Sequence, residues 1–286
     1  MNIYPGHMAK AKRVLKENLK NVDLVIEVLD ARIPYASHNK ELKNIIKDKE
    51  KIVVLNKKDL AEQQYTDEWL NVIKNSVKCI KINAVKKSGI NKLINLMEEK
   101  QEEINQKRVQ KGINRRPVRA IIIGIPNVGK SALINGIGGK ASAKTGNTPG
   151  VTRGKQWIRV TDNIELLDMP GILFPKAEDE DIAYKLVLTG AIDLKKVDTE
   201  MAAYKLLKYL KELKRLAVVA DNYDIDIYQG EHPYDILPKI GKARGCLMSG
   251  GKIDRNRAAK LLVNDYQNGK LGRVSLEKPG SDQFEF

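Results

Sequence analysis

The chain has 286 residues, of which 42% are hydrophobic and 30% are charged. This balance is typical of a soluble globular protein with room for two domains. No apolar run approaches the roughly 18 residues that a membrane helix needs, and the N-terminus lacks the apolar region of a signal peptide. The two cysteines, Cys79 and Cys246, favour reduced thiols over a disulfide or metal site. We therefore expect a cytoplasmic protein that does not enter a membrane.

The net charge of +15 is unevenly distributed. Residues 1–173 hold 32 Lys/Arg against 18 Asp/Glu, and residues 236–273 hold nine against two. A basic surface favours phosphate-rich partners through counterion release, although surface lysines can also serve solubility alone. Aromatic residues make up only 5% and form no strand typical of base stacking, which favours recognition of nucleic acid backbone and shape.

Strands and helices are expected to alternate in the first part of the chain, after a basic amphipathic helix at residues 8–20. The expected strands are 24–30, 51–55, 79–82, 119–123, 156–160 and 164–167. The expected helices are 39–48, 65–75, 90–106 and one that begins at Lys130. Such alternation predicts an α/β domain with a parallel sheet and helices on both of its faces.

After Pro175 the pattern changes to helical segments alone, which we predict at 179–190, 198–214, 233–243 and 255–267. We therefore place a first domain at residues 1–175 and an all-α domain at residues 176–286. The last dozen residues contain Pro279, Gly280 and Ser281 and are expected to fray.

A phosphate-binding motif follows the strand expected at 119–123. The segment Gly124-x₄-Gly129-Lys130-Ser131 lies between a β-branched strand and a helix, the context in which this motif binds phosphate. Its backbone N–H groups would surround the phosphates, Lys130 would bridge the β- and γ-phosphates, and Ser131 would ligate Mg²⁺. The predicted nucleotide contacts from this loop are Asn127, Val128, Gly129, Lys130, Ser131 and Ala132.

A second motif, Asp168-Met169-Pro170-Gly171, ends the strand expected at 164–167. The Asp168 carboxylate would hold Mg²⁺ through water, and the Gly171 N–H would meet the γ-phosphate. The motif is weak alone but specific at this distance behind a phosphate loop.

A third motif, Asn56-Lys57-Lys58-Asp59, ends the strand expected at 51–55. A carboxylate at Asp59 can accept hydrogen bonds from N1–H and N2–H₂ of guanine, two donors that adenine lacks. The Lys57 stem can cover the base plane, and Asn56 belongs to the same site. Downstream, Asn83-Ala84 resembles the Ser-Ala element whose backbone N–H contacts guanine O6.

The order of these motifs is unusual, because the guanine motif precedes the phosphate loop and does not recur after Ser131. With Pro5-Gly6-His7-Met8, Asp30-Ala31-Arg32-Ile33-Pro34 and Arg244-Gly245-Cys246-Leu247, this order resembles the ribosome biogenesis GTPase A family. The resemblance spans Pro5 to about Val274. It implies a circularly permuted P-loop GTPase domain followed by an all-α RNA-binding domain. It also implies that GTP is hydrolysed to GDP and phosphate by a monomer that acts late in maturation of the large (50S) ribosomal subunit. The expected partners are the subunit precursor and its rRNA, and this particle is expected to stimulate hydrolysis.

The hydrolytic residues depart from those of Ras-like enzymes, which carry a water-orienting glutamine where this chain has Ile172. The family resemblance assigns this role to His7; a merely structural histidine is the alternative. Thr152 resembles the threonine that meets Mg²⁺ and the γ-phosphate, with Thr148 as the second choice. In similar loops an asparagine such as Asn127 helps to bind K⁺, and the alternative is that it stabilises the turn.

Two other functions stay open at this stage. The chain could be an RNA-binding scaffold in which GTP only sets the conformation. It could also be a permuted GTPase that acts on the small subunit or on a tRNA-modifying partner. Comparing turnover alone with turnover on large-subunit precursors would separate these hypotheses from the leading one.

Overall fold

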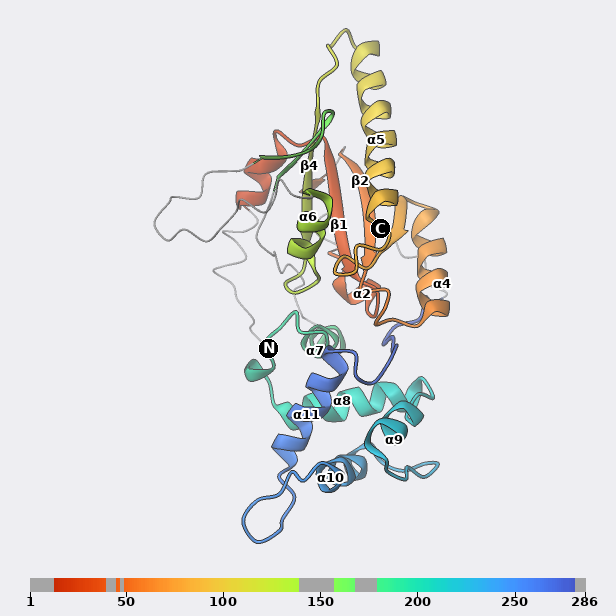
Figure 1. The fold of residues 1–286 in the computed structure, drawn as a ribbon, viewed down its shortest axis with the longest axis vertical. Helices are drawn as coiled ribbons and strands as arrows, with labels where there is room; N and C mark the ends of the chain where they lie inside the picture. Colours follow the sequence, from red (N-terminus) through yellow and green to blue (C-terminus); the bar gives the residue numbers. More distant parts are fainter. Residues whose placement is uncertain (1–12, 40–44, 47–48, 139–156, 168–178, 281–286) are drawn as a thin grey trace, which may run out of the picture.

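The structure, a computed structural model, describes residues 13–39, 45–46, 49–138, 157–167 and 179–280. Figure 1 shows a sheet with flanking helices in one part of the molecule and a group of helices beneath it. The boundary that we expected at residues 175 and 176 lies outside the described residues.

Six strands form one sheet in the order β3-β2-β1-β4-β6-β5. All neighbours are parallel except β5 and β6, which pair antiparallel. The expected strands are confirmed within a residue or two: β1 (Leu24–Asp30), β2 (Glu50–Asn56), β3 (Lys78–Lys81), β4 (Val118–Gly124), β5 (Trp157–Thr161) and β6 (Ile164–Leu167). Every residue of β1 is buried, as expected for a central strand that is covered on both faces.

Helices cover both faces of this sheet. On one face, α5 (Ile90–Gln110) and α6 (Lys130–Gly138) pack their apolar side chains against β1, β2 and β4. On the other face lie α4 (Gln63–Lys74), through Trp69 and Ile73, and the helical residues 13–19. Of the helix expected at 39–48, only residues 45 and 46 are both described and helical. A short helix that we did not predict, α2 (Pro34–Ser37), follows β1.

The helical domain contains the four helices that we expected: α7 (Glu180–Leu188), α8 (Thr199–Glu212), α10 (Pro233–Ala243) and α11 (Arg255–Gln267). Aspartates cap three of them, because the side chains of Asp179, Asp198 and Asp254 accept hydrogen bonds from first-turn N–H groups. Sequence analysis missed η2 (Leu194–Lys196) and α9 (Ala217–Tyr223), which are too short to show helical periodicity. No described helix is long and apolar enough to cross a membrane.

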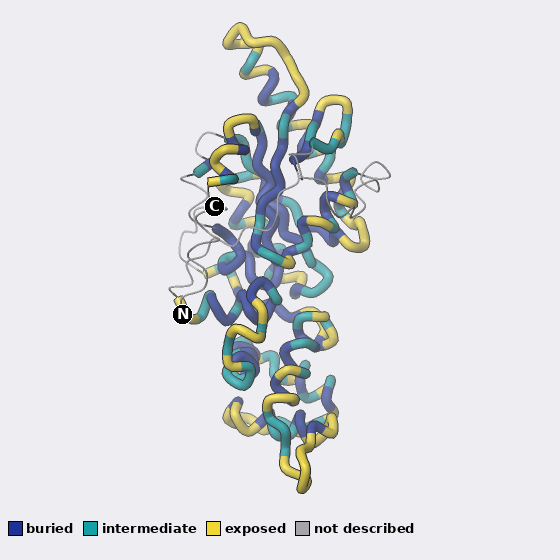
Figure 2. Tube along the Cα trace, turned by 90° about the vertical axis from the view of Figure 1, so that its left-hand side faces the viewer, coloured by how far each residue is buried: buried dark blue, intermediate teal, exposed yellow. Residues whose placement is uncertain are grey.

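The C-terminal segment, residues 274–277, shows that our expectation of a frayed last dozen residues was wrong for residues 275–277, whereas residues 281–286 lie outside the described residues. Val274 and Ser275 are 0% exposed, and Leu276 and Glu277 are 5% and 6% exposed. The segment returns from α11 to the sheet domain, where the Trp69 indole donates to the Glu277 carbonyl at 3.3 Å. In Figure 2 the buried residues continue from the sheet into the helices, and one of the three apolar clusters contains residues of both.

Candidate functional site

The motif loops meet at one edge of the sheet because parallel strands end there together. β1, β2 and β4 are adjacent, and they end at Asp30, Asn56 and Gly124. The guanine loop, residues 56–59, follows β2, and the phosphate loop, residues 124–131, joins β4 to α6. The topology therefore brings together two motifs that lie about 70 residues apart in the sequence.

Asn56 joins three motifs. Its side-chain Nδ2 donates to the Val128 carbonyl of the phosphate loop at 2.8 Å, and its Oδ1 accepts from the Ala84 N–H at 3.0 Å. Asn56 is 3% exposed, so both bonds are shielded from water. Sequence analysis placed Asn56 in the site without foreseeing this bridge. A guanine O6 that uses the Ala84 N–H would have to share it with Asn56.

Gly129 allows the phosphate loop to lie against Asn56. Its φ of +101° is in the left-handed region, and a Cβ there would come within 2.2 Å of Asn56 Nδ2. The glycine is thus required both by the backbone conformation and by the close approach of the two loops.

Lys130 is held inside the phosphate loop. Its Nζ donates to the Gly124 carbonyl at 3.0 Å and to the Ile125 carbonyl at 2.7 Å, and the residue is 7% exposed. The ammonium therefore lies where phosphate oxygens would be its charged partners. Ser131 and Ala132 follow in the first turn of α6, where Ser131 is exposed and its hydroxyl oxygen is a suitable ligand for Mg²⁺.

The guanine side is shaped by tight turns. Lys57 has a φ of +61°, and the Leu60 N–H donates back to its carbonyl at 2.9 Å. Asp59, two residues further, is half-buried, as a carboxylate that faces a base should be. Asn83 is buried and its Oδ1 accepts from the Lys86 N–H at 2.8 Å, which holds the turn after Ala84.

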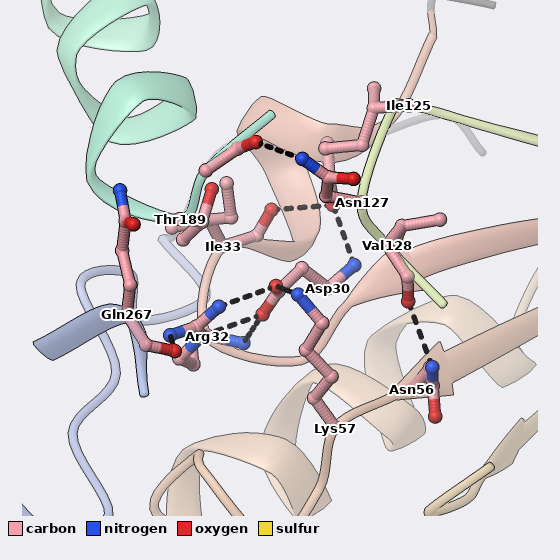
Figure 3. A network of polar contacts seen from close by, with 12 residues as sticks. Asp30, Arg32, Ile33, Asn56, Lys57, Ile125, Asn127, Val128, Thr189 and Gln267 are labelled. Carbon is pink, nitrogen blue, oxygen red and sulfur yellow. Dashed lines mark hydrogen bonds and ion pairs between the residues drawn. The ribbon is translucent and has the colours of Figure 1, made fainter. Parts of the chain in front are cut away.

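Asn127 has a contact that the sequence did not reveal. Its Nδ2 donates to the Gly190 carbonyl, just beyond α7, at 2.8 Å, so the phosphate loop is joined to the helical domain (Figure 3). Its φ of +56° is a conformation that asparagine adopts more readily than most residues. Four other predicted site residues lie outside the described residues: His7, Thr152, Asp168 and Gly171.

Comparison with known proteins agrees with this geometry. The sequence pattern of a family described as "50S ribosome-binding GTPase" matches residues 119–224. The chain is 42% identical to ribosome biogenesis GTPase A of Bacillus pumilus, over 97% of this chain and 98% of the relative. It is 32% identical to the Thermotoga maritima protein of the same name, over 98% and 95%. The chain belongs to the ribosome biogenesis GTPase A family.

Solved structures support the same assignment. GNP-bound YlqF from T. maritima has a TM-score of 0.66 and 28% identity over 94% of this chain and 98% of that one. The GDP-bound form has a TM-score of 0.68 and 27% identity over 93% and 99%. As expected from the motif order, the chain has a circularly permuted P-loop GTPase domain. It is a GTPase that binds GTP and GDP.

The basic part of the helical domain, residues 236–273, contains two kinds of cation. Arg244 and Arg255 have partners within the domain: Arg244 donates to the Asn222 carbonyl, and Arg255 donates to Glu200 and to the Tyr234 carbonyl. Arg244 is nevertheless exposed. Four other exposed cations of this region are Lys242, Lys252, Arg257 and Lys260. Charge counting could not separate these groups, because it ignores internal contacts.

Proposed function

We propose that this GTPase acts late in maturation of the large ribosomal subunit and that the subunit precursor stimulates its hydrolysis of GTP. The carrying observation is that a phosphate loop and a guanine loop are joined, through Asn127 and Gly190, to a domain with an exposed basic surface. Relatives named for ribosome biogenesis, and a family description that names the 50S ribosome, support this partner.

The described residues supply binding and charge for hydrolysis. Lys130 would exchange its loop carbonyls for oxygens of the β- and γ-phosphates, which places a positive charge where the transition state becomes more negative. Ile172 cannot orient water by hydrogen bonding, and the family resemblance points to His7 for that role, which we propose here. We assign contact with the γ-phosphate to Gly171.

A bound Mg²⁺ would supply positive charge that offsets the negative charge of the phosphates. The hydroxyl of Ser131 fits such an ion, and Thr152 and Asp168 are the other residues that we propose to hold it. We further propose that Asn127 can take part in a K⁺ site once its amide leaves the Gly190 carbonyl. The protein would act in the cytoplasm as a monomer.

We propose that four of the exposed cations, Lys242, Lys252, Arg257 and Lys260, contact rRNA phosphates. Changing all four to Gln should weaken co-sedimentation with large-subunit precursors at least tenfold. The log–log salt slope should fall by about 0.7–0.9 for each contact removed. GTP affinity should stay unchanged, because the nucleotide motifs lie in the other domain. The matched control changes four exposed lysines of the GTPase domain to Gln: Lys86, Lys87, Lys92 and Lys111.

Measuring GTP turnover in the presence of each particle, beside co-sedimentation, separates the alternatives. Stronger stimulation of GTP turnover by small-subunit particles would move the proposal to that subunit. Binding to large-subunit precursors without any stimulation would favour an RNA-binding scaffold. Equal binding by the four-Gln variant of the helical domain would remove this basic surface from the interface.

A further inference from the structure

The segment Asp30-Ala31-Arg32-Ile33-Pro34 has no role in the site as described so far, yet it contains the most deeply buried ion pair among the described residues of the domain. Asp30 is 1% exposed and Arg32 is 0% exposed. Arg32 Nε donates to Asp30 Oδ1 at 3.0 Å, and Nη2 donates to Oδ2 at 2.8 Å. Two parallel bonds of this kind fix the orientation of both side chains.

Asp30 also holds the guanine loop. Its Oδ2 lies 3.0 Å from Nζ of Lys57, the residue whose stem we expect to cover the guanine plane. Burial alone would raise the pKa of Asp30, but the charges of Arg32 and Lys57 hold that pKa far below its usual value. The carboxylate therefore stays ionised, and the Lys57 side chain extends toward it (Figure 3).

The remaining arm of Arg32 reaches the helical domain. Its Nη1 donates to the carbonyls of Tyr266 and Gln267 at 3.3 and 3.4 Å, and the guanidinium lies 5.2 Å from the centre of the Tyr266 ring. These carbonyls end α11, where a helix has unpaired acceptors and its dipole favours a cation. α11 has no basic residue in its own last turn, so Arg32 supplies that cation.

The C-terminal segment, residues 274–277, contacts Arg32 and also the residues that directly follow the guanine loop. The Val274 N–H donates to the Leu60 carbonyl at 3.0 Å, and the Leu276 N–H donates to the Arg32 carbonyl at 2.9 Å. The Glu62 N–H donates to Ser275 Oγ at 3.1 Å. The guanine loop is thus bounded by contacts with the helical domain on the Asp30 side and on the Leu60 side.

We propose that Arg32 is a positioning residue that couples the guanine loop to α11, so that nucleotide binding and the docking of α11 stabilise each other. Such coupling is reciprocal, so a partner that displaces α11 must weaken nucleotide binding by the same factor. α11 has 13 residues, a length of about 20 Å at about 1.5 Å per residue. Two of the exposed cations in our proposed rRNA contact lie on the same helix, Arg257 in its first turn and Lys260 near its middle. Only this last connection, to a phosphate-rich partner, rests on the proposed function.

The test uses the isolated full-length protein, so it does not depend on a ribosomal partner. Arg32→Lys keeps a positive charge beside Asp30 but loses the paired bonds and the reach to α11. We expect GDP affinity to fall by about fivefold or more, the lower end of typical coupling. In the wild type, GDP should slow hydrogen exchange of backbone amides 264–268 at the end of α11, and in Arg32→Lys this slowing should disappear.

The matched control is Arg108→Lys. Arg108 forms a mostly buried ion pair with Asp23 at 2.5 Å, at the end of α5. This variant should lose stability but keep the GDP affinity and the exchange response of the wild type. The proposal is overturned if Arg32→Lys keeps the wild-type GDP affinity and exchange response, or if Arg108→Lys loses them.

If Arg32→Lys does not fold, the wild type still decides the proposal, because unchanged hydrogen exchange of amides 264–268 on GDP binding would overturn coupling to α11. A second variant tests the C-terminal segment. Ser275→Ala removes only the acceptor for the Glu62 N–H, and we expect it to weaken GDP binding and the exchange response in the same direction. Unchanged GDP affinity in a folded Ser275→Ala protein would overturn coupling through the C-terminal segment.

Discussion

The two halves of the nucleotide site are joined to the helical domain in different ways. The guanine loop is held by buried contacts of Arg32 with the end of α11 and by the C-terminal segment beside Leu60. The phosphate loop is joined through the exposed Asn127 amide and the Gly190 carbonyl. A buried charged contact and an exposed neutral one differ in strength, since bonds to charged groups contribute about 1.5–3 kcal/mol and neutral ones about 0.5–1.5 kcal/mol.

This difference separates two functions of the site. The guanine loop is bounded by contacts with the helical domain, whereas the local contacts of Lys130 are made within the phosphate loop itself. A change in the docking of the helical domain should therefore alter nucleotide affinity more than it alters the local contacts of Lys130. The following substitutions test this division, beginning with the largest expected effect.

Asp59→Asn should strongly weaken the binding of guanine nucleotides. The amide offers one acceptor oxygen instead of two and places N–H donors against the donors of guanine. Sites built to hydrogen-bond a group reject mismatched analogues by about 10⁴-fold, and we expect a loss of GDP affinity approaching that size. Calorimetry with GDP and with xanthosine diphosphate provides the measurement and the control, because xanthine can accept from the new amide. Unchanged GDP affinity would remove Asp59 from the site.

Gly129→Ala should disturb both halves together. The left-handed backbone costs about 1–3 kcal/mol for a non-glycine residue. The new Cβ would also push against Asn56, at 2.2 Å from Nδ2. We expect GDP affinity to fall by roughly 10- to 100-fold, at about 1.4 kcal/mol for each factor of ten. Gly112→Ala is the control, because Gly112 has a φ of +71° but a Cβ added there would meet no atom within 4 Å. An equal loss in both variants would exclude contact between the loops as the cause.

Asn127→Gly should have the smallest effect. Glycine accepts the positive φ of this residue, so the substitution isolates the loss of the amide bond to Gly190. In the nucleotide-free protein we expect the free energy of unfolding in urea to fall by about 0.5–1.5 kcal/mol, with a smaller change in GDP affinity than in Arg32→Lys. A larger loss of affinity than in Arg32→Lys would reverse the comparison between the two halves.

The motif loops could be predicted from the sequence because each depends on a few residues at fixed spacing beside a strand. The role of Arg32 could not, since its acceptors on α11 lie 234 and 235 residues away. In a count of charges Arg32 belongs to the basic surface, whereas in the structure it is fully buried. The available signal was its position between Ala31 and Ile33, two residues after an aspartate that ends a buried strand.

The C-terminal segment was missed for a similar reason. Glycine, proline and serine in the last dozen residues are typical of a frayed end, yet Ser275 and Glu277 are buried by partners far away in the sequence. Local composition indicates which backbone conformations a segment prefers, but it cannot predict contacts with residues that are distant in the sequence. Asn127 shows the same limit, because Gly190 is 63 residues away.

The contact between Glu62 and Ser275 spans 213 residues and has a consequence for the order of folding during synthesis. The guanine motif is among the first parts of the chain to be made, but the residues that support it are made more than 200 residues later. Contacts of such long sequence separation form late, because the entropy of closing the loop must be overcome first. Guanine binding is therefore expected to reach its full affinity only after the helical domain has been synthesised, so a partly made chain should hold nucleotide more weakly.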